Sequence, residues 1–227
     1  MLSKEINGIS LAYLKKGEGE KAAIFLHGNG ESSALFAPYL DKIPFEGSVY
    51  AIDTRGHGES EYKEPFTIAR FAEDVKAFIK SENLTDVTLA GYSDGANIAF
   101  FCAEMPEVKR LYAVSGNLYE NALKKKFLIP CRIIYALLFP LSLLPAIKRR
   151  RALLRLMLTD IGLDEQRLAA NCGKTTVICA DNDLIKQSHS LFLAEKTGNE
   201  LIVFENSTHF SVIHRFMEKV VNGEIKL

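Results

Sequence analysis

The chain has 227 residues, 48% of them hydrophobic and 25% charged, with 28 Lys+Arg balanced by 28 Asp+Glu. This composition excludes intrinsic disorder, collagen and coiled coils. The net charge of zero also removes the electrostatic argument for nucleic-acid binding. We expect a globular protein of one or two domains, large enough to fold without a disulfide or a structural metal.

The cysteines and the N-terminus both favour a cytoplasmic protein. No pair or metal-ligand spacing joins the four cysteines, which we expect to be buried free thiols: Cys102, Cys131, Cys172 and Cys179. Residues 1–20 alternate polar and apolar positions and lack the apolar segment of a signal peptide. They predict the first strands of a domain.

Short apolar runs alternate with helical patterns along the chain, which is typical of a mostly parallel sheet. Strands are expected at 22–26, 48–52, 87–90, 111–114, 175–179 and 201–204. Helices are expected at 68–79 (with Thr67 as its N-cap), at 96–103, between the last two strands, and at 212–221. The predicted fold class is therefore α/β, with a mostly parallel central sheet flanked by helices.

One long stretch between the fourth and fifth of these strands differs in composition. Residues 121–159 contain nine Lys or Arg and no Asp or Glu, and residues 127–147 are nearly all apolar. The apolar run approaches the ~20 residues of a membrane-spanning helix. Arg132, three prolines and the position between two core strands argue against a span. We predict a helical cap at 117–173, inserted into a core formed by residues 1–116 and 174–227.

The sharpest motif is Gly91-Tyr92-Ser93-Asp94-Gly95, directly after a predicted strand and before a predicted helix. A serine nucleophile must project from a tight strand-to-helix turn, where only small neighbours fit. The helix N-terminus then lies behind Ser93, and the Asp94 N–H can point at a developing oxyanion. His27-Gly28-Asn29-Gly30, after the strand at 22–26, supplies the Asn29 N–H as a second donor.

A serine hydroxyl needs an imidazole to take its proton. We expect His209 to be this base, because it lies in a loop between the last strand and the C-terminal helix. His189 and His214 are predicted to lie on helices as packing or surface residues. His27 and His57 follow strands in His-Gly turns and are predicted to brace loops by hydrogen bonds.

The base in turn needs a carboxylate to orient it and to stabilise the imidazolium. Asp181 and Asp183 follow the strand at 175–179, at the same edge of the sheet. We favour Asp183, because a turn after the strand end is needed to direct a carboxylate toward the final loop. Glu120 is a third candidate.

Together these motifs resemble the α/β-hydrolase fold family, in its serine esterase and C–C hydrolase branch. They occur in the family's order: His27 to Gly30, Asp53 to Ser60, Gly91 to Gly95, then Asp183 and His209. The resemblance implies a Ser93–His209–Asp183 triad, oxyanion donors at Asn29 and Asp94, and a cap at the position of the basic insertion. The chain departs from the family at Ala180, where relatives often have Gly before the acid loop.

The predicted reaction is hydrolysis of a small-molecule carboxylic ester through an acyl-enzyme, without a metal or a cofactor. We expect an apolar substrate pocket lined by Tyr92, Phe127, Ile134 and Leu138. The Lys/Arg cluster of the cap could attract an anionic part of the substrate.

Three alternatives stay open at this point. The same triad can cleave a carbon–carbon bond of a β-diketone-like compound, and the same fold can serve as a ligand receptor with an inert pocket. The basic cap could also rest weakly on an anionic membrane surface. The sequence leaves the oligomeric state undetermined.

Overall fold

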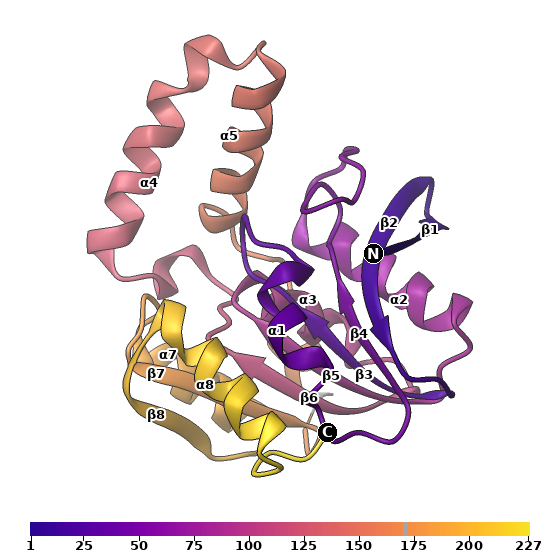
Figure 1. The fold of residues 1–227 in the computed structure, drawn as a ribbon. Helices are drawn as coiled ribbons and strands as arrows, with labels where there is room; N and C mark the ends of the chain where they lie inside the picture. The colour runs from indigo at the N-terminus through magenta and orange to yellow at the C-terminus, as the bar shows by residue number, and fades with distance from the viewer. Residues whose placement is uncertain (170–171) are drawn as a thin grey trace.

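An eight-stranded sheet forms the centre of the computed structural model, which describes residues 1–169 and 172–227 (Figure 1). The strand order across the sheet is β1-β2-β4-β3-β5-β6-β7-β8. The two N-terminal strands pair antiparallel, and every pair from β4–β3 onward is parallel. The predicted fold class is confirmed. The strands are β1 Leu2–Ile6, β2 Ile9–Lys16, β3 Lys21–Leu26, β4 Ser48–Ile52, β5 Asp86–Tyr92, β6 Val108–Val114, β7 Thr175–Asn182 and β8 Leu201–Thr208.

Helices cover both faces of this sheet, because its central strands are apolar on both sides. In β3, Ile24 and Leu26 pack into the cluster beneath α2, α3 and α7, whereas Ala23 and Phe25 pack into the cluster beneath α1 and α8. Thr67 caps α2 by accepting a hydrogen bond from the Arg70 N–H, as predicted. The helices are α1 Ala37–Leu40, α2 Ile68–Ser81, α3 Asp94–Cys102, α4 Lys125–Leu137, α5 Pro145–Met157, α6 Glu165–Ala169, α7 Gln187–Lys196 and α8 His209–Val221.

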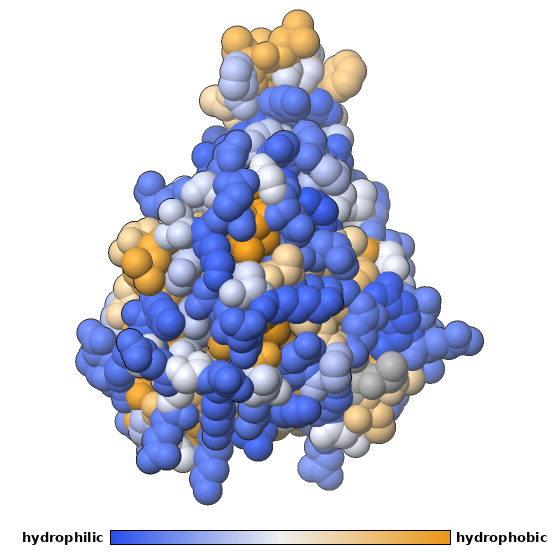
Figure 2. Space-filling view, turned by 90° about the vertical axis from the view of Figure 1, so that its right-hand side faces the viewer, coloured by the Kyte–Doolittle hydropathy of each residue, from blue (hydrophilic) through white to orange (hydrophobic). Residues whose placement is uncertain are grey.

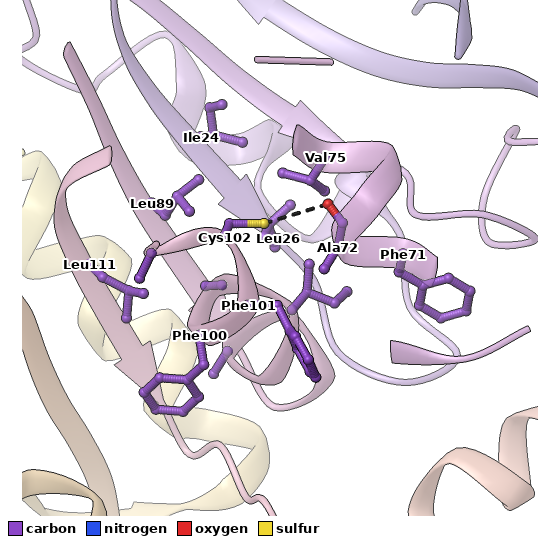
Figure 3. Close-up of a cluster of buried hydrophobic side chains, with 14 of the residues drawn as sticks. Ile24, Leu26, Phe71, Ala72, Val75, Leu89, Phe100, Phe101, Cys102 and Leu111 are labelled. Carbon is purple, nitrogen blue, oxygen red and sulfur yellow. Dashed lines mark hydrogen bonds between the residues drawn. The ribbon is translucent and has the colours of Figure 1, made fainter. Parts of the chain in front are cut away.

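The core beneath α2 and α3 also holds one of the four cysteines. The Cys102 thiol is buried and donates to the Ala72 carbonyl at 3.6 Å (Figure 3). Cys179 on β7 is buried as well. The expectation of four buried thiols is wrong for the other two, because Cys131 on α4 is only half-buried and Cys172 in the approach to β7 is exposed.

The C-terminal helix begins earlier than the apolar pattern predicts. Thr208 and Ser211 form a capping box, in which the Thr208 hydroxyl accepts from the Ser211 N–H and the Ser211 hydroxyl accepts from the Thr208 N–H. The helix therefore starts at His209, which the sequence placed in a loop. His209 is consequently held by the first turn of a helix and by a strand that ends one residue before it.

Helices α4 and α5 form a hairpin that projects from the rest of the molecule (Figure 1). Between them lies a short turn that includes a single 3₁₀ turn at Phe139–Leu141. Within the described residues, no helix is both long enough and apolar enough to cross a bilayer. We keep 117–173 as the proposed extent of a cap; residues 170 and 171 of that range lie outside the described residues.

Candidate active site

Ser93 occupies a sharp turn between β5 and α3. Its φ of +53° and ψ of −119° form a strained conformation for a residue with a side chain. A Cβ on Gly91 would lie 2.2 Å from the Gly95 carbonyl oxygen, and one on Gly95 would lie 2.1 Å from the Leu26 carbonyl oxygen. Only glycine fits at either position, so the two glycines are what allow the turn to form. The turn is fixed further by the Ser93 N–H, which donates to the Val114 carbonyl at 2.8 Å.

The structure brings Ser93, His209 and Asp183 into one hydrogen-bonded row. His209 Nε2 lies 3.2 Å from Ser93 Oγ, and His209 Nδ1 lies 2.6 Å from Asp183 Oδ1. The serine comes from the β5–α3 turn, the histidine from the start of α8 and the aspartate from the loop after β7. Because parallel strands end at the same edge of a sheet, residues far apart in the sequence meet there.

The Asp183 carboxylate is buried but well supplied with donors. It accepts from the Ser115 hydroxyl at 2.5 Å and from the N–H groups of Ala180 and Ile185, both at 3.1 Å. Burial raises the pKa of Asp183, but the hydrogen bond and the charge of His209, together with the other donors, outweigh it and hold the pKa below its ordinary value. The group is therefore an anion at neutral pH, able to orient the imidazole and stabilise its charged form.

Asn29 and Asp94, the two predicted oxyanion donors, line the same pocket as Ser93. In the part of the chain that the structure describes, no protein group accepts from the N–H of Asn29 or from that of Asp94. The Asn29 side chain instead donates to Asp94 Oδ2 at 2.9 Å and to the Leu153 carbonyl on α5 at 3.0 Å. Burial raises the pKa of Asp94 to about 6.

A pocket of about 260 Å³ opens at this point. Tyr92 lines it, but Phe127, Ile134 and Leu138 lie along α4 and at its end, outside the lining. The described residues of the lining include two carboxylates, Glu31 and Asp94, and no Lys or Arg. The lining residues are Gly28, Asn29, Glu31, Tyr92, Ser93, Asp94, Asn117, Leu123, Met157, Leu184, Ile185, His209 and Phe210.

A family model described as alpha/beta hydrolase fold matches residues 22–143, more than half of the chain. The chain belongs to the alpha/beta hydrolase fold family. Solved structures agree with this assignment over nearly the whole length of the protein. A meta-cleavage product hydrolase from Pseudomonas fluorescens IP01 superposes with a TM-score of 0.76 at 17% identity, covering 98% of this chain and 96% of the other. A lipase-esterase related protein from Clostridium acetobutylicum gives 0.72 at 24%, covering 94% and 98%. At these identities the likeness shows the fold.

Curated relatives of this α/β hydrolase match a shorter part of it. Ethanol acetyltransferase 1 of Cyberlindnera fabianii is 31% identical over 102 residues, which are 43% of this chain and 30% of the relative. A probable alcohol acetyltransferase of Wickerhamomyces anomalus is 36% identical over 101 residues, again 43% and 30%. The matched part of the chain thus spans less than a third of the length of these relatives.

The other acidic candidates of this α/β hydrolase lie away from His209. Asp181 is at the exposed surface, where it accepts from the N–H groups of Asn206 and Ser207 at 2.8 and 2.9 Å. Glu120 accepts two hydrogen bonds from the Arg132 guanidinium. Neither carboxylate hydrogen-bonds the imidazole, whose two nitrogens contact Asp183 and Ser93.

The four remaining histidines make contacts outside the Ser93–His209–Asp183 row. His27 Nε2 accepts from the Thr54 N–H at 3.1 Å, and His57 Nδ1 lies 3.0 Å from the Thr54 hydroxyl, so both brace the loop after β4. Burial lowers the pKa of His57 to about 3 and that of His189 to about 4, so both rings are neutral at ordinary pH. His214 on α8 contacts the Tyr39 hydroxyl at the surface.

Sequence reasoning missed two polar residues of the site. Ser115 has a φ of +53° immediately after β6, and this conformation lets its hydroxyl reach Asp183. Glu31 accepts from the Gly28 N–H at 3.0 Å and lines the pocket. Both follow predicted strands at the edge of the sheet that carries Ser93, which is the only signal that could have found them. Among the described residues, no group of three or more His, Cys, Asp or Glu is arranged to hold a metal ion.

Proposed function

We propose that this protein hydrolyses carboxylic esters through an acyl-enzyme formed on Ser93, with His209 as general base and Asp183 as its orienting carboxylate. The observation that carries the proposal is the pair of contacts made by one imidazole ring. His209 Nε2 lies 3.2 Å from the Ser93 hydroxyl while Nδ1 lies 2.6 Å from Asp183. With the proton on Nδ1, donated to Asp183, the Nε2 lone pair faces the hydroxyl that it must deprotonate.

In acylation, Ser93 Oγ attacks the ester carbonyl carbon as its proton moves to His209 Nε2. The N–H groups of Asn29 and Asp94 donate to the carbonyl oxygen as it becomes negative. The bond from the carbonyl carbon to the alcohol oxygen then breaks, and His209 gives its proton to that oxygen. In deacylation a water molecule attacks the acyl group, His209 takes its proton, and the proton returns to Ser93 Oγ as the acid leaves.

The pocket favours a small substrate that carries no negative charge. Its volume of about 260 Å³ lies just below the roughly 300–1,000 Å³ of most small-molecule sites. Leu123, Met157 and Leu184 provide apolar lining, whereas Glu31 and Asp94 supply the charge. An anionic acyl group, which the basic insertion suggested, would face these carboxylates with no lining cation among the described residues. We therefore propose neutral or cationic esters of short acids.

The curated relatives support a second candidate, transfer of the acyl group to an alcohol. Both relatives are named as alcohol acetyltransferases, although the matched part covers 30% of their length. The chemistry differs in a single step, because an alcohol takes the place of water in attacking the acyl group on Ser93. Competition between ethanol and water for the acyl-enzyme therefore distinguishes the two activities.

The decisive experiment measures turnover of fluorogenic esters of graded acyl length, with and without added ethanol. We expect Ser93→Ala to lower kcat by about 10⁴-fold or more and to abolish labelling by a fluorophosphonate. Ser142→Ala, on the hairpin, serves as the control and should retain both. Undiminished turnover in Ser93→Ala would overturn the proposal, and a β-diketone panel measured alongside tests carbon–carbon cleavage.

The charge of the pocket is tested separately with Glu31→Gln. This change keeps an oxygen that can accept from the Gly28 N–H but removes one negative charge. We expect the ratio of kcat/KM for a succinyl ester to that for a butyryl ester to rise roughly tenfold. Glu46→Gln, at an exposed position, should leave the ratio unchanged. An unaltered ratio in Glu31→Gln would show that Glu31 does not select substrates by charge.

A further inference from the structure

The end of the α4–α5 hairpin exposes a group of large apolar side chains. Leu143 is 95% exposed, Leu137 71% and Phe139 64%. Figure 2 shows an orange cluster of hydrophobic residues at the end of the projection, above a blue band. The other large apolar residues exposed on this hairpin are Ile129, Ile133, Ile134, Leu141 and Leu144. We call residues 137–144 the hairpin tip.

Packing within the molecule does not account for these side chains. Along the whole of α4 only Leu128 is buried, and along α5 only Ala152 and Leu156. Soluble monomers rarely leave a contiguous apolar patch of this kind in water, so such a patch marks a surface that binds a partner.

The charges around the hairpin tip indicate the chemical nature of this partner. Residues 121–159 carry nine Lys or Arg and no acid. Some of these cations serve the fold: Arg151 lies over the Tyr135 ring, and Arg149 donates to the Gly56 carbonyl. Lys125, Lys148 and Arg150 make no ion pair with any described residue. The partner must therefore offer an apolar interior behind an anionic surface.

We propose that the hairpin tip docks on an anionic lipid bilayer, its leucines and Phe139 entering the boundary between headgroups and acyl chains. Lys148 and Arg150, one turn along α5, would then meet the lipid phosphates. A second copy of the chain fits less well, because two tips in contact would bring their cations together without counter-charges. Helix α5 has 13 residues and so spans about 20 Å at 1.5 Å per residue, and Met157 at its far end lines the pocket. The bilayer would hold the pocket about one helix length from its surface.

Sedimentation with vesicles tests this proposal. The full chain is mixed with vesicles of phosphatidylcholine alone or of phosphatidylcholine with phosphatidylglycerol, and we expect binding to the second kind only. Leu143→Asp should abolish binding, and the double change Lys148→Gln/Arg150→Gln should weaken it roughly 30-fold. The matched controls are Leu191→Asp, at a leucine 48% exposed on α7, and Lys42→Gln/Lys80→Gln, both of which should bind normally.

Fluorescence gives a second and independent reading, because the chain contains no tryptophan. Leu143→Trp should shift its emission to shorter wavelength on addition of anionic vesicles, and Leu191→Trp should not shift. Ser93→Ala should bind like the wild type, so failure of the hydrolase proposal would not affect this one. Binding that ignores lipid charge, or an unshifted Leu143→Trp spectrum, would overturn the proposal. So would a dimer in sedimentation equilibrium that Leu143→Asp dissociates.

Discussion

Arginine pairs with a carboxylate through two hydrogen bonds in two regions of this molecule, once in the core and once between the α4–α5 hairpin and the 3₁₀ turn before it. In the core, Arg55 Nε and Nη2 donate to Asp74 at 2.7 and 2.8 Å, and both side chains are 1% exposed. On the hairpin, Arg132 Nε and Nη2 donate to Glu120 at 2.9 and 2.7 Å, with the side chains 58% and 21% exposed. The bond geometry is alike, so the difference between the two pairs lies in the solvent around them.

This difference shows that the two regions constrain their residues in different ways. In the core, removal of Asp74 leaves the Arg55 charge buried without a counter-charge, so the structure itself dictates the carboxylate. On the hairpin, water can replace a lost partner of Arg132, so folding does not require this ion pair. Folding does not require the exposed leucines of the hairpin either. The composition of the hairpin therefore requires a reason outside the folded chain, which lipid docking supplies.

The largest expected effect on stability comes from breaking the Arg55–Asp74 pair in the core. Asp74→Asn leaves Arg55 buried with its charge unbalanced, and we expect a loss of about 3–5 kcal/mol in the free energy of unfolding. Glu120→Gln, which removes the partner of Arg132 on the hairpin, is the matched control and should leave the urea midpoint unchanged. Urea denaturation followed by circular dichroism measures both. Equal losses for the two variants would contradict the distinction between the regions.

The next effect lies where the two regions meet, because Asn29 joins Asp94 in the core to the Leu153 carbonyl on α5. The pKa of Asp94 rises from an unfolded value of 3.8 to about 6 in the folded protein. A raised pKa means that the folded state binds the proton more tightly. This contribution to stability is therefore complete below the unfolded pKa and is lost as the pH rises through the folded pKa.

The measurement compares Asp94→Asn with the wild type from about pH 4 to about pH 7. Because Asn does not ionise, the difference in unfolding free energy, variant minus wild type, should increase by about 2 kcal/mol across this range. A constant difference for Asp94→Asn would mean that this carboxylate keeps an ordinary pKa.

The contrast between the regions also separates what the sequence predicts from what it does not. Apolar strands that end at one sheet edge, and a serine between two glycines, were enough to predict that Ser93, Asp183 and His209 meet. Ser115 was not predictable, because its contact with Asp183 depends on a positive φ that no neighbouring residue signals. The start of α8 at His209 depends on a side-chain cap, which apolar periodicity does not register.

The surroundings of the apolar residues on the hairpin could not be predicted for another reason. The sequence predicts that these apolar residues line a substrate pocket, but an apolar run carries no information on whether it faces a pocket or water. Ile134 is 41% exposed and lies outside the pocket lining. Apolar pattern identifies residues that need a partner, and only the structure shows whether that partner belongs to the same chain.

The smallest expected effect tests this last point within a single helix. Leu128 on α4 is buried against Ile185 and its neighbours, whereas Leu137 near the end of the same helix is 71% exposed. Leu128→Ala should lower the free energy of unfolding by about 2–3 kcal/mol, and Leu137→Ala should change it by less than about 0.5 kcal/mol. Both substitute Ala for Leu in a helix, so helix propensity cancels in the comparison. A large loss for Leu137→Ala would mean that the hairpin tip packs against its own chain in solution, and lipid docking would then have no free apolar surface to act through.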